Sequence, residues 1–183
     1  MGALVLGACV DDTIRPADAG PEEPPDAGAP GAVDPEEPLD VSGLPYRCEA
    51  GVVDAVTGLA YEALDPGGDI PIGGSGQAGL VARLALQLQA EPDEELPEVL
   101  VTLLLTNVLD GTDGDSKLAD TPQRLGCQEG SCELAPVLVE ISHLAKLPEL
   151  EGLVVRVDAT VRDAGDADRV LCRARNHGVL VRQ

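Results

Sequence analysis

A strict two-residue alternation of aliphatic and polar side chains constrains this fold more than any other feature of the chain. Its apolar positions are Leu153, Val155, Val157, Ala159 and Val161, and its polar positions are Arg156, Asp158, Thr160 and Arg162. Successive side chains of a strand point to opposite faces, so this spacing predicts one face in the core and one in water. Such half-buried strands are typical of antiparallel sheets.

Similar patterns occur in several other segments after Pro45. They cover residues 46–54, 59–64, 80–90, 99–108, 137–141, 169–175 and 179–182, with turn-forming clusters at 65–68, 110–115 and 176–178. Seven or eight short strands separated by turns within residues 46–183 predict an all-β domain. We expect an antiparallel, immunoglobulin-like β-sandwich.

The segment 80–90 is the ambiguous one, because Leu, Ala, Arg and Gln are also good helix formers. Alternation places Leu80, Ala82, Leu84, Leu86 and Leu88 on one face. A helix would instead place Leu86 among the polar residues. The pattern therefore favours a strand.

The core of this domain must be built almost entirely from aliphatic side chains. Hydrophobic residues make up 44% of the chain, yet it has two Tyr and no Phe or Trp. Leu, Val, Ile and Ala must fill the interior, and β-branched residues suit a pleated surface. The same shortage removes the aromatic platforms on which sugars or single-stranded nucleic acid stack.

The formal net charge of -21 excludes polyanions as partners. Nucleic-acid binding depends on cationic side chains that displace counterions from phosphates, and this surface would repel both nucleic acids and anionic head groups. No run approaches the roughly 20 apolar residues of a spanning helix. Any membrane attachment is therefore expected to be through lipid.

Residues 10–45 differ in composition from the rest of the chain. They contain eight Pro, ten acidic residues and one basic residue, Arg15. Such a segment buries too little apolar area to offset its ordering entropy, so we predict a disordered acidic linker. Fully stretched it would reach on the order of 110 Å. The alternative is a tail whose only role is solubility.

The residues before this linker carry a recognisable motif. Leu6, Gly7, Ala8 and Cys9, preceded by a short apolar run, resemble the lipobox that ends a bacterial lipoprotein signal peptide. This resemblance implies that residues 1–9 are the remnant of a signal peptide and that lipid is attached to Cys9. The alternative interpretation is a chance occurrence of these four residues in an apolar N-terminus.

The lipoprotein resemblance also implies a location and a role. Val10 follows the cysteine as in lipoproteins sorted to the outer membrane. Residues 67–163 are similar in pattern to small uncharacterised β-sandwich lipoproteins of GC-rich Gram-negative bacteria. We therefore expect a lipid-anchored protein of the outer membrane or cell surface, with a non-catalytic structural or adhesive domain that contacts another envelope or extracellular protein.

The remaining four cysteines, Cys48, Cys127, Cys132 and Cys172, suggest disulfides in an exported protein. Three pairings are possible. Cys127 and Cys132 enclose a short loop that closes easily, which leaves Cys48 to join Cys172. A zinc site built from the same residues is the alternative, although the chain has no C-x-x-C pair.

A calcium site is the second functional hypothesis. Asp110, Asp113 and Asp115 form an acidic turn whose oxygens could bind Ca²⁺. Their spacing departs from the D-x-D-x-D-G loop, and no Glu stands at the distal ligand position. A solvated acidic loop is the simpler interpretation.

A nucleotide site is the third hypothesis. Residues 74–79, from Gly74 to Gly79, match G-x-G-x-x-G, which in dinucleotide-binding folds joins a strand to a helix. Here the preceding apolar run contains Pro71, and the following segment alternates like a strand. A glycine-rich loop between two strands explains the residues more simply.

The sequence offers little for catalysis. His143 adjoins Ser142, which in a strand points to the opposite face, and His177 is expected in a turn beside Gly178. No G-x-S-x-G motif occurs. We expect neither an enzyme nor a bound cofactor.

Overall fold

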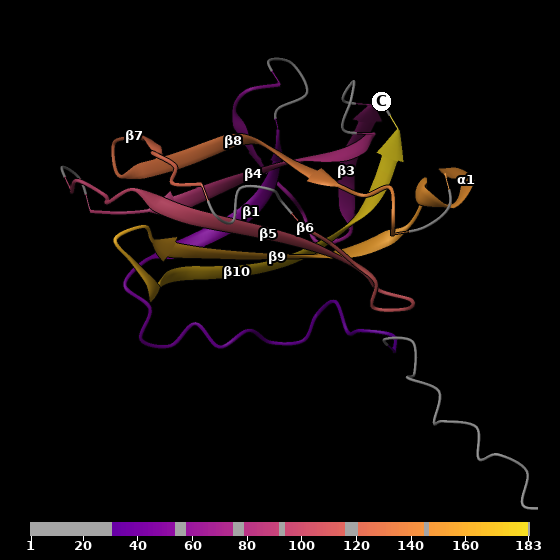
Figure 1. The fold of residues 1–183 in the computed structure, drawn as a ribbon, viewed down its shortest axis with the longest axis horizontal. Helices are drawn as coiled ribbons and strands as arrows, with labels where there is room; N and C mark the ends of the chain where they lie inside the picture. Colours follow the sequence, from indigo (N-terminus) through magenta and orange to yellow (C-terminus); the bar gives the residue numbers. More distant parts are fainter. Residues whose placement is uncertain are drawn as a thin grey trace, which may run out of the picture.

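The computed structural model describes residues 31–53, 58–74, 79–91, 94–115, 121–144 and 147–182. Cys9 and the other residues of the lipobox lie outside this part of the chain. Within it the protein is all-β, with ten strands joined in one mixed sheet (Figure 1). The predicted fold class is confirmed. Because the hydrogen-bonded sheet is continuous, the immunoglobulin-like division into two sheets is not confirmed.

The sheet order places strands from distant parts of the sequence side by side. It runs β2 (Tyr61–Ala63), β1 (Arg47–Val53), β4 (Leu80–Gln89), β3 (Gly68–Gly74), β10 (Asp166–Arg182), β9 (Val154–Asp163), β5 (Val99–Asn107) and β6 (Asp113–Asp115). On the far edge of β4 lies β8 (Ser131–Glu140), which carries β7 (Gly126–Gln128). Among the strands that the structure describes, β3 and β10 are the one pair that runs in parallel. A single helical turn, α1 (Leu147–Leu150), precedes β9.

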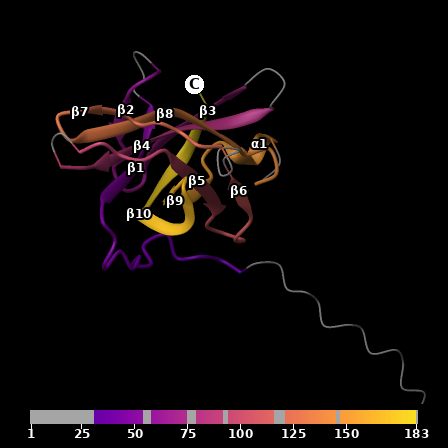
Figure 2. The same cartoon turned by 60° about the vertical axis from the view of Figure 1, so that its left-hand side comes forward.

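The sheet bends back over itself around an aliphatic core. Figures 1 and 2 both show β4 and β8 on the opposite side of the molecule from β9 and β10. Buried side chains from both sides belong to one cluster, which includes Leu84, Leu86, Val101, Leu103, Val157 and Leu180. The core thus holds Leu, Val, Ile and Ala together with Cys48, Cys132 and Cys172, as the composition required.

The alternation that predicted β9 is confirmed residue by residue. Val155, Val157, Ala159 and Val161 are at most 1% exposed, and Leu153 just before the strand is 8% exposed. The intervening polar residues are only partly buried, on the outer face. The segment 80–90 also forms a strand, β4, whose Leu84, Leu86 and Leu88 are fully buried in the core.

The turn predicted at residues 176–178 is wrong. These residues lie inside β10, which continues without a break, so His177 is a strand residue. Gly178 is required there by close approach and not by a turn. A Cβ at this position would lie 2.6 Å from the backbone oxygen of Gly68 in the adjacent strand β3. Glycine in a strand often marks such a contact.

Three strands were not predicted: β3, β6 and β7. The first is rich in glycine and contains Pro71, which argued against a paired strand. At Pro71, β3 pairs with β10 on one edge, whereas its pairing with β4 on the other edge begins at Ile72. Because one edge of the strand is unpaired at Pro71, a residue without an N–H is tolerated there. The other two strands have three residues each, too few to show a period.

Both predicted disulfides are present. Cys48 in β1 joins Cys172 in β10, across 124 residues, and both sulfurs belong to buried residues. Cys127 joins Cys132 within the β7–β8 hairpin. The four cysteines therefore form two separate pairs and do not gather at one zinc site.

Candidate functional site

The candidate site is a groove between the edges of β1 and β10. One edge of β1 pairs with β4, but its other edge is paired, with β2, only from Gly51 onward. Between described residues, one backbone hydrogen bond joins β1 and β10: the Tyr46 N–H, just before β1, donates to the Leu171 oxygen over 3.1 Å. The Cys48–Cys172 disulfide fixes the same end. Beyond this end no backbone pairing joins the two strands where the chain is described.

The other end of the groove is closed by the loop between β2 and β3. The Asn176 Nδ2 donates to the Leu64 oxygen over 2.6 Å, and the Gly67 N–H donates to the His177 oxygen over 3.0 Å. The groove therefore has two fixed ends. Its shape depends on covalent and hydrogen-bonded contacts between segments more than 100 residues apart.

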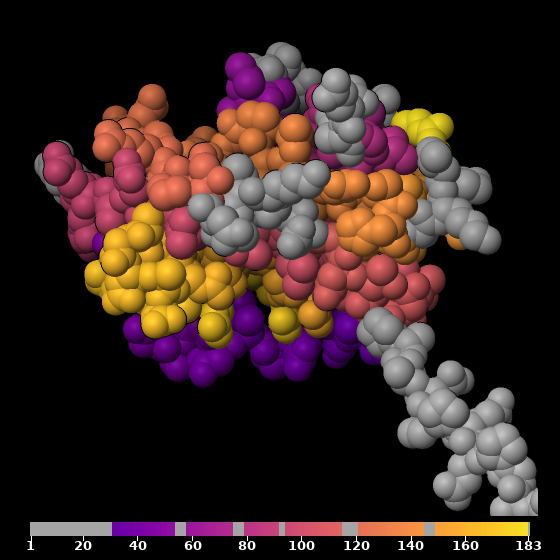
Figure 3. Space-filling view, in the orientation of Figure 1, coloured from indigo at the N-terminus to yellow at the C-terminus, as the bar shows by residue number. Residues whose placement is uncertain are grey.

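An extended segment, residues 33–44, forms one wall of the groove, and we call it the strap. It runs along the outside of β10 and β9, as the violet segment in Figures 1 and 3 shows. The Val33 N–H donates to the Val108 oxygen over 3.0 Å at one end of the strap. At the other end the chain turns at Gly43, which has a φ of 75°, and enters β1. The strap belongs to the segment predicted to be a linker.

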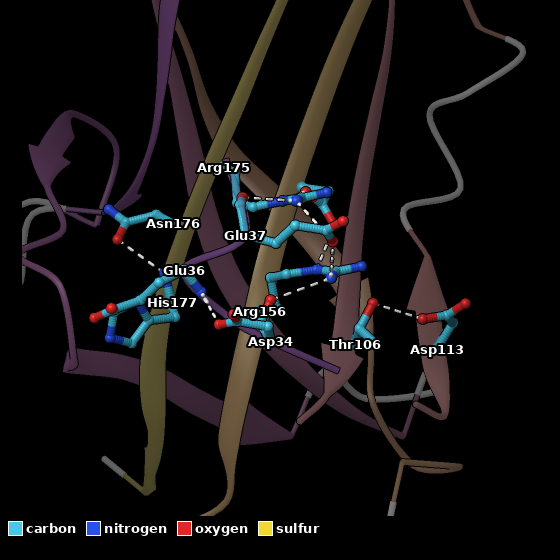
Figure 4. Close-up of polar contacts among 10 residues, drawn as sticks. Asp34, Glu36, Glu37, Thr106, Asp113, Arg156, Arg175, Asn176 and His177 are labelled. Carbon is cyan, nitrogen blue, oxygen red and sulfur yellow. Dashed lines mark hydrogen bonds and ion pairs between the residues drawn. The ribbon is translucent and has the colours of Figure 1, made fainter. Parts of the chain in front are cut away.

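Two arginines on the outer face of the sheet hold the strap. Arg156 of β9 and Arg175 of β10 both contact Asp158, over 2.9 and 2.6 Å, and both approach the Glu37 carboxylate, over 3.7 and 3.4 Å. We call Arg156, Asp158 and Arg175 the arginine clasp. Figure 4 shows the two guanidinium groups on either side of Glu37.

The clasp also binds strap backbone. Arg175 Nη1 donates to the Glu37 carbonyl oxygen over 2.9 Å, and Arg156 Nη1 donates to the Asp34 carbonyl oxygen over 3.4 Å. The side chains of Arg156 and Arg175 are only 13% and 16% exposed. Two cations on the outer face are thus largely covered by a piece of chain that arrives from the N-terminal side.

The groove has a volume of about 960 Å³ and an unusual lining. Both tyrosines, which are the only aromatic residues of the chain, line it. So do three arginines and three glutamates, in addition to apolar side chains of the strap: Arg47, Arg173, Arg175, Glu36, Glu37 and Glu49. Three positive against three negative charges make this surface locally neutral on a chain with a net charge of -21.

The tyrosine hydroxyls are held by carboxylates. Tyr46 donates to Glu94 over 2.6 Å, and this hydrogen bond raises the pKa of the phenol. Tyr61 donates to Glu49 over 3.2 Å. Burial, followed by the charge of Glu49, raises the pKa of Tyr61 to about 12. Both phenols therefore stay neutral well above physiological pH and present a ring with a fixed polar end.

Two cations at the groove have no carboxylate within ion-pair distance among the described residues. Arg47 of β1 and Arg173 of β10 are both exposed, and neither takes part in the ion pairs that the structure shows in this part of the chain. Their side chains extend from the two strands that border the groove. They can receive an anionic group of a ligand.

The predicted calcium ligands are partly committed to the protein itself. Asp110 accepts a hydrogen bond from the Thr112 N–H over 2.9 Å, and Asp113 accepts one from the Thr106 hydroxyl over 2.6 Å. Asp115 pairs through its backbone with Leu104, and its side chain lies outside the described part of the chain. Where the chain is described, no three His, Cys, Asp or Glu side chains lie close enough to hold a metal ion.

The predicted nucleotide motif lies between two antiparallel strands. Gly74 ends β3 and pairs with Leu80 of β4, while residues 75–78 lie outside the described part. The dinucleotide motif requires a helix after the loop, and here a strand follows. The flanking geometry is that of a glycine-rich connection.

The two histidines lie in different parts of the fold. The ring nitrogen Nε2 of His143 hydrogen bonds with the Asp113 carbonyl oxygen, and Ser142 donates to Glu140 over 3.0 Å. His177 lies at the groove, in β10. The sequence did not identify the groove. The sequence feature that could have indicated the groove is the position of both tyrosines in one short stretch of the chain, at 46 and 61.

Comparison of the chain with known protein families, with curated proteins and with solved structures finds no match. No helix among the described residues has the length and hydrophobicity needed to cross a membrane.

Proposed function

We propose that this chain is an exported, lipid-anchored protein of the bacterial cell envelope whose β-domain binds another protein, in a structural or adhesive role and not as a catalyst. The observation that carries this proposal is the groove. It brings both aromatic residues and three arginines to one locally neutral surface whose ends are fixed by a disulfide and by hydrogen bonds.

The lining of the groove favours a protein partner. Tyr and Arg are the residue types most enriched at the energetically important centres of protein interfaces. The Tyr61 ring packs against the β1 backbone: a Cβ added to Gly51 would lie 2.5 Å from it. A ring that is already fixed loses little entropy on binding. The volume of about 960 Å³ suits several residues of a peptide.

Export is supported by the disulfides, which form and persist in oxidising compartments. A lipid on Cys9 would attach the domain through residues 10–32, a stretch that can span roughly 75 Å when extended. The net charge of -21 would keep the domain away from anionic head groups. Together these features suit a binding domain held at a distance from a membrane.

The anchor is tested by mass spectrometry of the chain expressed, with its upstream reading frame, in a lipidating bacterial host. We expect a mature protein that begins at an acylated Cys9 and sediments with membranes. The variant Cys9→Ala should be recovered without lipid. Unmodified wild-type protein that retains Met1 would contradict the proposal.

The groove is tested by site-specific photo-crosslinking in the same host. A photoreactive residue in place of Arg47 should give a discrete adduct with one envelope protein. The matched control replaces Leu138 of β8, which is 43% exposed and does not line the groove. Adducts of equal yield at both positions, or at neither, would count against binding in the groove.

A further inference from the structure

The arginine clasp binds the strap through features that many peptides share. Its two arginines donate to two backbone carbonyl oxygens, those of Asp34 and Glu37, and approach one carboxylate, that of Glu37. These hydrogen bonds and ion pairs use backbone oxygens and one carboxylate, which many peptides offer. The chemistry of this site is therefore that of a receptor for an extended chain with an acidic residue.

The strap itself is weakly held. None of residues 31–45 is buried, although Val33, Pro35, Leu39 and Leu44 are partly covered. The Glu37 side chain is 62% exposed, so its ion pairs are screened by water. Segments with few buried apolar contacts open with small free energies. The strap is thus the part of the described chain best suited to leave its site.

The charge of the clasp favours binding of another acidic group when the strap is absent. Asp158 contacts both Arg156 and Arg175, and one carboxylate neutralises only one of two guanidinium groups. Without Glu37 the clasp would carry one net positive charge, on a chain whose total is -21. An acidic group that approaches this face would be attracted by the clasp, whereas most of the surface would repel it.

We propose that the clasp is the docking site for an extended acidic segment of the partner protein, and that the strap occupies this site in the free protein as a built-in competitor. The inference rests on the proposed function, because it names the chemistry of the partner. Since the strap is also a wall of the groove, its departure widens the groove and gives the partner access to the groove and the clasp together.

Competition by a tethered segment has a measurable consequence. The strap acts at an effective concentration of the order of millimolar, so a free peptide of the same sequence binds the wild-type chain poorly. The apparent affinity for the peptide rises in proportion to the fraction of molecules in which the strap has left the clasp. Loss of the exposed Glu37 ion pairs should raise that fraction about two- to fivefold, and the peptide affinity equally.

The probe is a fluorescein-labelled synthetic peptide with the sequence of the strap, residues 33–44, and binding to the full chain is followed by fluorescence anisotropy. Glu37→Gln should bind the peptide about two- to fivefold more tightly than the wild-type chain. The control is Glu151→Gln. It removes the same charge from an exposed residue outside the strap and the groove, and its affinity should equal that of the wild type.

The receptor side is tested in the same assay. Arg175→Gln combined with Glu37→Gln should abolish the gain, and so should a peptide in which the residue equivalent to Glu37 is Gln. Equal affinities for all variants would overturn the proposal. So would a shift of the Glu37→Gln chain to dimers without peptide binding, because that result would assign the clasp to the strap of a second copy.

These outcomes are independent of the tests of the proposed function. Acylation at Cys9 and crosslinking at Arg47 can both succeed while the peptide fails to bind. Only the clasp proposal would then be wrong. Conversely, peptide binding that depends on Arg175 supports the clasp even in an expression host that does not lipidate the chain.

Discussion

The two faces of the β9–β10 pair are held by different forces. On the inner face Val155, Val157 and Leu180 are fully buried and pack against strands from the other side of the core. On the outer face Arg156 and Arg175 hold the strap by hydrogen bonds and ion pairs. The same two strands therefore support a rigid interior and an exchangeable cover. This difference separates what keeps the protein folded from what it presents to a partner.

The largest effect on the free energy of unfolding is expected at the disulfide between β1 and β10. Replacement of Cys48 and Cys172 by Ala removes a link across 124 residues, and chain entropy predicts a loss of roughly 5 kcal/mol in the free energy of unfolding. The matched control replaces Cys127 and Cys132, which are five residues apart, and should lose about 2 kcal/mol. Urea denaturation measures both. Equal losses would show that the long link does not restrain the unfolded chain.

Core packing should give the next largest effect. Leu105 of β5 is fully buried, and Leu105→Ala is expected to cost about 2–5 kcal/mol because it leaves a cavity among aliphatic side chains that cannot easily refill it. Leu104, the neighbouring residue on the outer face, is only partly buried, so Leu104→Ala should cost less. The comparison is made by urea denaturation. A larger cost at Leu104 would reverse the assignment of the two faces.

The buried inner face of β9 was predictable from the sequence, whereas the contacts of the outer face with the strap were not. The alternation at residues 153–161 reports which side chains are buried, and that local rule assigned the inner face of β9 correctly. The cysteine pairing followed because one short loop closes easily. Both inferences depend on residues that are close in the sequence or few in number.

The groove depends on contacts that no local pattern contains. Its walls come from the strap, from β1 and β2, and from β10, so Glu37, Tyr61 and Arg175 meet only in the folded chain. The parallel pairing of β3 with β10 joins segments more than 100 residues apart, and Pro71 argued against it. The composition of residues 10–45 predicted a disordered linker. It could not show that two arginines on an outer face would bind that segment.

High pH should loosen the groove before it unfolds the core. Because burial and Glu49 raise the pKa of Tyr61 to about 12, the neutral phenol is favoured in the folded state over the unfolded one, where the pKa is near 10. This contribution to stability is present below pH 10 and is lost as the pH rises towards 12. Absorbance of the phenolate should show one late titration, absent from Tyr61→Phe. If the titration step that Tyr61→Phe removes lay near pH 10, the burial of this ring would be contradicted.

The smallest effect on the free energy of unfolding should come from loss of the contacts between the strap and the clasp. Such a small effect would show that the strap is not part of the folded core. Glu37→Gln removes the ion pairs between the strap and both arginines, yet we expect at most about 1 kcal/mol of loss in global unfolding, since the Glu37 side chain is 62% exposed and exposed ion pairs contribute little. Amide hydrogen exchange in residues 33–44 should nonetheless become faster, because those amides exchange by local opening of the strap. Glu151→Gln removes the same charge from an exposed residue outside the strap and the groove, and should leave the exchange unchanged. If Glu37→Gln destabilised β9 and β10 as much as the strap, the two faces of the pair would be one cooperative unit, and a partner could not displace the strap without unfolding the domain.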